Sequence, residues 1–83
     1  TRSLARELGP DGVGVTAIAP GILITPSTDY VPEHRHRLYQ DGRAVPGPQP
    51  PEDIAPTVAF LLTEGALTLT GQVLPLNRGF VFT

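Results

Sequence analysis

The sequence contains no cysteine, no methionine and no tryptophan, and all six of its basic residues are arginine. Without cysteine, disulfide bonds and thiolate-zinc sites are excluded. No apolar run is long enough to cross a bilayer and no signal peptide is recognisable, so we expect a cytoplasmic protein without a membrane partner. The net charge of −2 and the isoelectric point of about 5.5 argue against a nucleic-acid-binding surface.

The residues that are present indicate a single small folded unit. Eighty-three residues make at most one domain, and a hydrophobic fraction of 40% is typical of a globular protein. Leu4, Ala5 and Leu8 share one helix face, which predicts a first helix that ends at Gly9–Pro10. Because the chain opens inside this helical pattern and without a methionine, we expect it to be a fragment.

The stretch Val13–Pro26 organises the rest of the chain. Its β-branched and small apolar residues predict a strand over 13–19 that is covered on both faces in a parallel sheet. Pro20 ends the strand because proline has no N–H for the ladder, and Gly21 frees the backbone to turn sharply. Ligands of open α/β sheets bind beyond the carboxyl ends of the strands. Such a crevice wall and an ordinary strand with its loop are equally compatible with these residues.

Residues 27–50 are the most polar and least periodic part of the chain. Pro32 and Glu33 predict the start of a short helix that ends near Gly42. Two histidines, His34 and His36, lie in it but point apart on a helix, and no third ligand is near, so we expect no metal site. The following prolines predict an extended linker over 43–51.

The last third of the chain predicts a helix and a strand. An apolar stripe indicates a helix over 51–63 that stops near Gly65, with a disturbed first turn because Pro56 lacks an N–H. A second strand is expected over 72–76, at the edge of the sheet because it contains Pro75. A turn follows at 77–79, and the apolar tail 80–82 is expected to pack on the protein itself or on a sister subunit.

Several short motifs recur in this order in one known family. They are Leu4–Val13, Ala17–Gly21 with Thr25–Pro26, Pro51–Ala55 with Ala59–Leu61, and Thr70–Val73. Together they closely resemble the C-terminal part of classical short-chain dehydrogenase/reductases. The resemblance implies an α/β fold: the last two strands and flanking helices of a Rossmann-type doubly wound parallel sheet. Residues 1–83 would then be the C-terminal part of one NAD(P)-binding Rossmann domain, with a substrate-lid region over 26–50.

The resemblance also implies site residues. Pro20, Gly21 and Ile22 would line the nicotinamide side of an NAD or NADP cofactor, and Thr25 would hold its carboxamide or phosphates. The lid residues that could touch substrate are Tyr30, Tyr39 and Arg43. No metal ligands are implied.

Two departures from the family pattern stand out. Arg78 occupies a position in the final turn where the family has glycine, which questions the local geometry. The catalytic Ser and the Tyr-x-x-x-Lys pair are absent, and the chain has no lysine to partner either of its tyrosines. We expect those groups upstream, and we expect these 83 residues alone to be inactive.

Two hypotheses of function follow. The first is a fragment of an NAD(P)-dependent oxidoreductase that interconverts an alcohol and a carbonyl by hydride transfer and that is a homo-oligomer, dimer or tetramer, when intact. The alternative is a non-catalytic truncated relative that acts as an interaction or assembly module.

Overall fold

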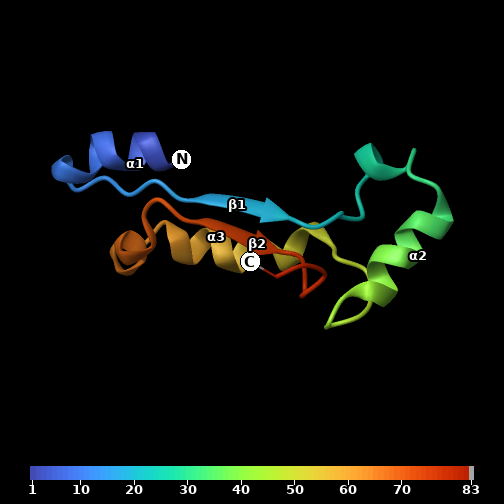
Figure 1. Ribbon diagram of the computed structural model, residues 1–83. Coiled ribbons are helices and arrows are strands. Elements are labelled where there is room, and N and C mark those ends of the chain that lie inside the picture. Colours follow the sequence, from blue (N-terminus) through green and yellow to red (C-terminus); the bar gives the residue numbers. More distant parts are fainter. Residues whose placement is uncertain (83) are drawn as a thin grey trace.

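The computed structural model describes residues 1–82 and contains a short parallel sheet with helices around it (Figure 1). The helices and strands in chain order are α1 (Arg2–Leu8), β1 (Ala17–Pro20), α2 (Glu33–Gly42), α3 (Ala55–Leu61) and β2 (Val73–Leu76). Short 3-10 turns cover Gly9–Asp11, Pro26–Thr28, Pro51–Asp53 and Glu64–Leu69. Among the helices of this described range, none is long and apolar enough to span a membrane.

The two strands lie side by side and run parallel, as the sequence predicts. Their register pairs Ala17 with Val73 and Pro20 with Leu76. The N–H groups of Ala17 and Gly21 donate to carbonyls of the β2 segment. Because these donors stand at odd positions, the missing N–H of Pro20 faces the other edge of β1 and costs no bond to β2. Proline at the last position of the strand is thereby tolerated.

The first strand is shorter than the predicted 13–19. Residues 13–16 run beside the turn before β2 instead of beside a strand. Val15 donates to the Thr70 hydroxyl oxygen at 2.9 Å and accepts from the Gly71 N–H at 2.7 Å. Gly71 has a φ of 84°, which no β ladder accommodates, so regular pairing begins only after it.

The helix predictions are confirmed in kind, with shifted ends. The first helix ends at Leu8, but the left-handed residue is Gly12 at a φ of 77°, because a 3-10 turn continues the coil past Gly9. The lid helix spans the predicted residues. The third helix begins at Ala55 and not at the predicted residue 51, and a separate 3-10 turn over Pro51–Asp53 precedes it, in agreement with the disturbed first turn expected from Pro56. It ends at Leu61, before the predicted stop at Gly65, which lies in the next 3-10 turn.

The chain leaves much apolar surface uncovered. Its accessible surface is 5863 Å², whereas a closed monomer of 8.8 kDa exposes about 4,800 Å². The radius of gyration is 15.1 Å, against about 12 Å for a compact domain of this length. The buried apolar side chains are those of Ala5 and Ala66, and Ala19 and Pro20 of β1 are exposed. The prediction that β1 is covered on both faces is therefore not met within residues 1–82.

Residues 43–51 were predicted to be an extended linker. Residues 43–50 contain no helix or strand, but Gln49 is only 2% exposed, so this part of the chain is packed and not a free connection. The Gln49 amide donates to the Leu76 carbonyl, and its own backbone carbonyl accepts from the Ile24 N–H at 3.0 Å. The Leu76 carbonyl also accepts from the Gly21 N–H at 3.0 Å. We call this meeting of 21–24, 43–49 and 76–79 the strand-end junction.

The turn after β2 explains how arginine replaces glycine there. Arg78 has a φ of 55° and Gly79 a φ of 80°, the left-handed geometry of a tight turn closed by the Phe80 N–H to the Asn77 carbonyl. Asn77 Oδ1 also accepts from the N–H groups of Gly79 and Phe80. Arg78 Nε lies 2.6 Å from Asp53 Oδ2, an ion pair that offsets the strain of a non-glycine residue in this conformation.

This ion pair predicts an acid-sensitive contribution to stability. The hydrogen bond from Arg78 holds the pKa of Asp53 below its ordinary value. A depressed carboxyl pKa contributes stability above the unfolded-state pKa, about 3.9, and loses it as the pH falls through the folded-state value. In the intact protein, Asp53→Asn should lower the denaturant midpoint at pH 7, and the difference from wild type should shrink below about pH 4. Glu52→Gln, one residue away, is the control, and a pH-independent difference for Asp53→Asn would contradict the assignment.

The junction predicts that Gly21 tolerates no side chain. A Cβ at this position would lie 2.7 Å from Gln49 Oε1 and 3.1 Å from Asn77 Cβ. Gly21→Ala should therefore destabilise the intact protein by about 1–3 kcal/mol in urea unfolding. Gly9→Ala is the matched control, because nothing lies within 4 Å of its added Cβ. Equal unfolding midpoints for the two variants would show that the junction is not tightly packed.

Candidate functional site

A cavity of about 730 Å³ runs along the sheet from Gln72 and Val73, at the start of β2, to the carboxyl ends of β1 and β2. The carboxyl ends are where ligands of open α/β sheets bind, and the volume falls in the range of small-molecule sites. Its walls come from Arg2 of α1, both strands and the loops after them, the end of α2 and the C-terminal tail. The lining residues are Arg2, Ala19, Pro20, Gly21, Ile22, Tyr39, Arg43, Gln72, Val73, Pro75, Asn77, Phe80 and Val81.

The structure brings most of the predicted site residues together. Pro20, Gly21 and Ile22 form one wall of the cavity, and Tyr39 of α2 and Arg43 directly after α2 also line it. Tyr30 does not line it and is 85% exposed. A neighbouring hollow of about 480 Å³ contains Tyr30 and shares Ile22 and Tyr39 with the main cavity. Ile22 and Tyr39 thus separate the two spaces.

Thr25 stands apart from the other three predicted cofactor residues. It precedes the 3-10 turn Pro26–Thr28, and its Oγ1 lies 2.8 Å from Ser27 Oγ in an exposed hydrogen bond. Its N–H donates to Thr28 Oγ1 at 3.2 Å. The Thr25 side chain therefore shapes the loop beyond the cavity and is absent from the cavity lining among the described residues.

Arg43 is buried against the backbone of the cavity wall. Its side chain is only 4% exposed, and it donates from Nη2 to the Ile22 carbonyl at 3.0 Å and from Nη1 to the Gly47 carbonyl at 2.7 Å. Burial lowers the pKa of Arg43, the nearby Arg78 cation lowers it further, and Asp53 partly offsets both effects. Both terminal nitrogens of this guanidinium thus bind the protein's own main chain.

Sequence reasoning missed Gln49 and Asn77. Gln49 supports the wall from behind, and Asn77 lines the cavity while its Oδ1 closes the final turn. Asn77 carried a signal, because asparagine before two left-handed residues is typical of a tight turn. For Gln49 the sequence carried only a weak indication of a role, namely a single amide side chain within a proline-rich stretch.

Helix α2 and the C-terminal tail meet at one aromatic contact. The rings of Tyr39 and Phe80 lie 5.1 Å apart between centroids at 64°, an edge-to-face arrangement. A Cβ at Gly42 would lie 2.8 Å from the Phe80 ring, so glycine permits this close approach. The tail prediction is therefore confirmed for Phe80, whereas Val81 and Phe82 are exposed.

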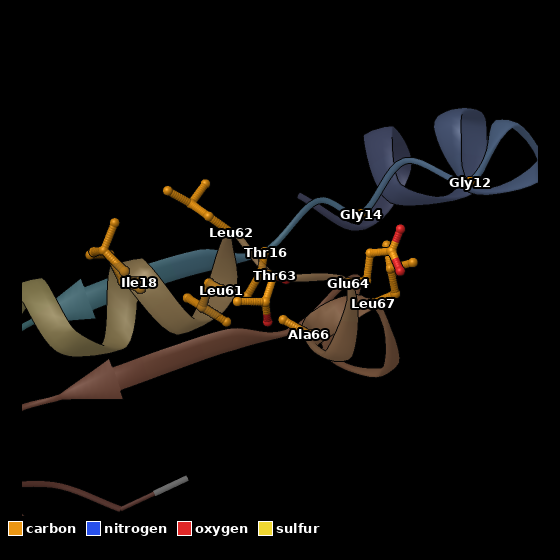
Figure 2. A pocket seen from close by; sticks show the side chains of 11 residues that line it. Gly12, Gly14, Thr16, Ile18, Leu61, Leu62, Thr63, Glu64, Ala66 and Leu67 are labelled. Atoms are coloured by element: carbon orange, nitrogen blue, oxygen red, sulfur yellow. The ribbon is translucent and has the colours of Figure 1, made fainter.

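A second cavity, of about 490 Å³, lies toward the other end of β1 (Figure 2). Ile18 of β1, Leu61 of α3 and Leu67 of the following 3-10 turn line it. Thr16, Thr63 and Glu64 also line it, and within residues 1–82 no cluster of three His, Asp or Glu residues could hold a metal ion. It lies away from the carboxyl ends of the strands, so the cavity that reaches those ends is the better candidate site.

Comparison with known families gives a match over almost the entire chain. Residues 1–81 match the family model described as "Enoyl-(Acyl carrier protein) reductase". The chain is 38% identical over 79 residues to the 3-oxoacyl-[acyl-carrier-protein] reductase FabG of Aquifex aeolicus, covering 95% of this chain and 32% of that protein. It is 31% identical over 80 residues to the 7alpha-hydroxysteroid dehydrogenase of Bacteroides fragilis, covering 95% and 31%. The chain spans about a third of the length of the curated relatives it matches.

A solved structure supports the fold. The chain superposes on a 4-hydroxyisoleucine dehydrogenase, complexed with NADH and succinate, with a TM-score of 0.82 at 22% identity. The match covers 98% of this chain and 33% of that one. This likeness confirms a fragment of a Rossmann-type α/β sheet. Together with the match over residues 1–81, it identifies the chain as a member of the short-chain dehydrogenase/reductase family.

Proposed function

We propose that the intact protein is an NAD(P)-dependent oxidoreductase that interconverts an alcohol and a carbonyl by hydride transfer. The observation that carries the proposal is the cavity at the carboxyl ends of β1 and β2, with Pro20, Gly21 and Ile22 along one wall. Its relatives are named as reductases and dehydrogenases, and the superposed dehydrogenase was complexed with NADH. In this proposal the present chain provides a wall of the nicotinamide site.

The residues present fit the nicotinamide end of such a cofactor. The wall is apolar and rigid, because the Gly21 N–H is bonded to β2 and the Ile22 carbonyl to Arg43. When bound, the cofactor supplies the hydride. Pro20, Gly21 and Ile22 would orient it and exclude water from its reactive face. The exposed Thr25 hydroxyl, now hydrogen-bonded to Ser27, could bond to a cofactor oxygen instead, so we propose Thr25 as the fourth cofactor residue.

The lid over 26–50 would close on the substrate. Tyr39 lines the cavity, and Tyr30 lines the smaller hollow next to it. An acid/base that protonates the substrate oxygen is still required. Because the chain has no lysine to activate a tyrosine, we propose that this pair belongs to another part of the intact protein. The exposed Val81 and Phe82 are proposed to contact a sister subunit in a cytoplasmic homo-oligomer.

An assembly module is the second candidate function. The excess accessible surface and the exposed tail would also suit a chain that docks on a partner without catalysis. The two proposals differ in whether the cavity takes a nicotinamide cofactor. Binding of NADH or NADPH to the intact protein therefore separates them.

A charge in the cavity wall should weaken cofactor binding. In the intact protein, Ile22→Glu would place a carboxylate in the apolar wall, and the affinity for NADH or NADPH in a fluorescence titration should fall at least tenfold because the bound nicotinamide would cover the carboxylate and remove its hydration. Leu38→Glu is the matched control, since Leu38 lies on the exposed face of α2. If both variants bind the cofactor like wild type, the nicotinamide does not lie against this wall.

The 83 residues by themselves should be inactive and should self-associate. Within the described chain β1 pairs only with β2, so its other edge keeps unpaired backbone groups. We expect no oxidation of NADH or NADPH with any carbonyl, and oligomers or aggregates in size-exclusion chromatography. A monodisperse monomer with a sharp unfolding transition, or clear turnover, would contradict this expectation.

A further inference from the structure

The lid is attached to the sheet mainly at its base. Residues 23–42 leave the sheet after Ile22 and return at Arg43, and α2 stands apart from the layer of β1, β2 and α3 (Figure 1). Higher up, the lid helix contacts the tail through the rings of Tyr39 and Phe80. We call the two segments that connect 23–42 to the sheet, at Ile22 and at Arg43, its stems. The position of the lid over the cavity therefore depends on how these two stems are joined.

Arg43 joins these stems directly. Its Nη2 donates to the Ile22 carbonyl at 3.0 Å across 21 positions of sequence, and its Nη1 donates to the Gly47 carbonyl at 2.7 Å. Hydrogen bonds from a charged donor are stronger than neutral ones, and burial strengthens them further. A planar guanidinium can make both bonds at once, which a lysine ammonium cannot do with the same geometry.

The charges around Arg43 favour this role over a bond to a carboxylate. The neighbouring carboxylate, Asp53, is bonded to Arg78 at 2.6 Å, and Arg43 forms no ion pair with any residue of the described chain. Arg43 Nε is buried without a hydrogen-bond partner among these residues. The guanidinium is thus held by two backbone carbonyls, at a residue that also lines the cavity.

We propose that Arg43 is a positioning residue that clamps the base of the lid to the cavity wall through the Ile22 carbonyl. By doing so it sets where Tyr39 lies above the cavity, and it contacts neither substrate nor cofactor. The inference rests on the proposed function, because it assigns the lid to substrate binding. It replaces the sequence-based expectation that Arg43 touches substrate.

Hydrogen exchange on the intact protein tests the clamp without any assay of activity. In Arg43→Ala, amides of residues 23–42 should exchange at least tenfold faster, whereas those of β2 should keep their wild-type rates. In Arg43→Lys, the exchange rates of residues 23–42 should lie between those of wild type and Arg43→Ala, since an ammonium restores one bond at most. Arg37→Ala is the matched control: it removes the same charge from the lid helix at an exposed site, where Arg37 pairs with Glu33 at 3.8 Å.

Steady-state kinetics then tests the role in substrate binding. A lid that is open part of the time lowers apparent substrate affinity in proportion to the closed fraction. The KM of Arg43→Ala should rise about tenfold for acetoacetate and its methyl ester alike, if both are turned over, with kcat changed less than threefold. Inactivity of wild-type protein toward every carbonyl would refute the proposed function and leave the exchange result to decide the clamp.

Three results would overturn the proposal. One is wild-type exchange in the lid of Arg43→Ala. Another is faster exchange throughout the protein, including β2, in both Arg43→Ala and Arg43→Lys, which would make Arg43 a residue of general stability. The third is a loss of affinity for acetoacetate alone with the lid unchanged, which would mean that Arg43 binds the substrate carboxylate.

Discussion

The Leu76 carbonyl is the acceptor on which the site depends. It accepts hydrogen bonds from the Gly21 N–H at 3.0 Å and from the side-chain amide of Gln49, and so it joins the end of β1, the end of β2 and the segment 43–49. Leaving a buried polar group of this kind without its partner costs about 1–3 kcal/mol. Because Gly21 and Ile22 also form the cavity wall, the same contact that ends the sheet fixes the shape of the site.

A small group of charges reinforces this junction from the other side. Asp53, in the 3-10 turn before α3, pairs with Arg78 in the final turn. Both charges act on the pKa of Arg43: Arg78 lowers it and Asp53 raises it. The pairing leaves Arg43 to bind backbone carbonyls. An arginine in the left-handed position of the turn thus gains a partner that glycine could not have had. The departure from the family pattern at Arg78 is accommodated locally, within residues that also support the lid.

The sequence predicted the elements well where the signal is local. Pro32 and Glu33 set the start of the lid helix, Pro20 and Pro75 marked strand positions that need no N–H, and Pro56 disturbed the first turn of its helix. The site residues Pro20, Gly21 and Ile22 were predicted through the family resemblance, and their meeting with Tyr39 and Arg43 in one cavity appears only in three dimensions.

Contacts between distant segments could not be predicted. Nothing in the prolines around Gln49 reveals that its amide reaches Leu76, because 27 positions separate the two residues. The shorter length of β1 also depends on a distant segment, since Gly71, in the turn before β2, sets where regular pairing begins. The burial of Arg43 likewise depends on Ile22 and Gly47. Composition and periodicity describe one segment at a time, and these features arise between segments.

We propose that Pro20, Gly21 and Ile22, which line the cavity at the carboxyl ends of β1 and β2, form one wall of a nicotinamide site. A crystal structure of the intact protein with NADH or NADPH bound tests it most directly. We expect the nicotinamide ring to lie against Pro20, Gly21 and Ile22, with the lid helix on the opposite side of the reacting face. A nicotinamide bound elsewhere, or a cavity filled by another part of the intact protein, would contradict this assignment of the wall.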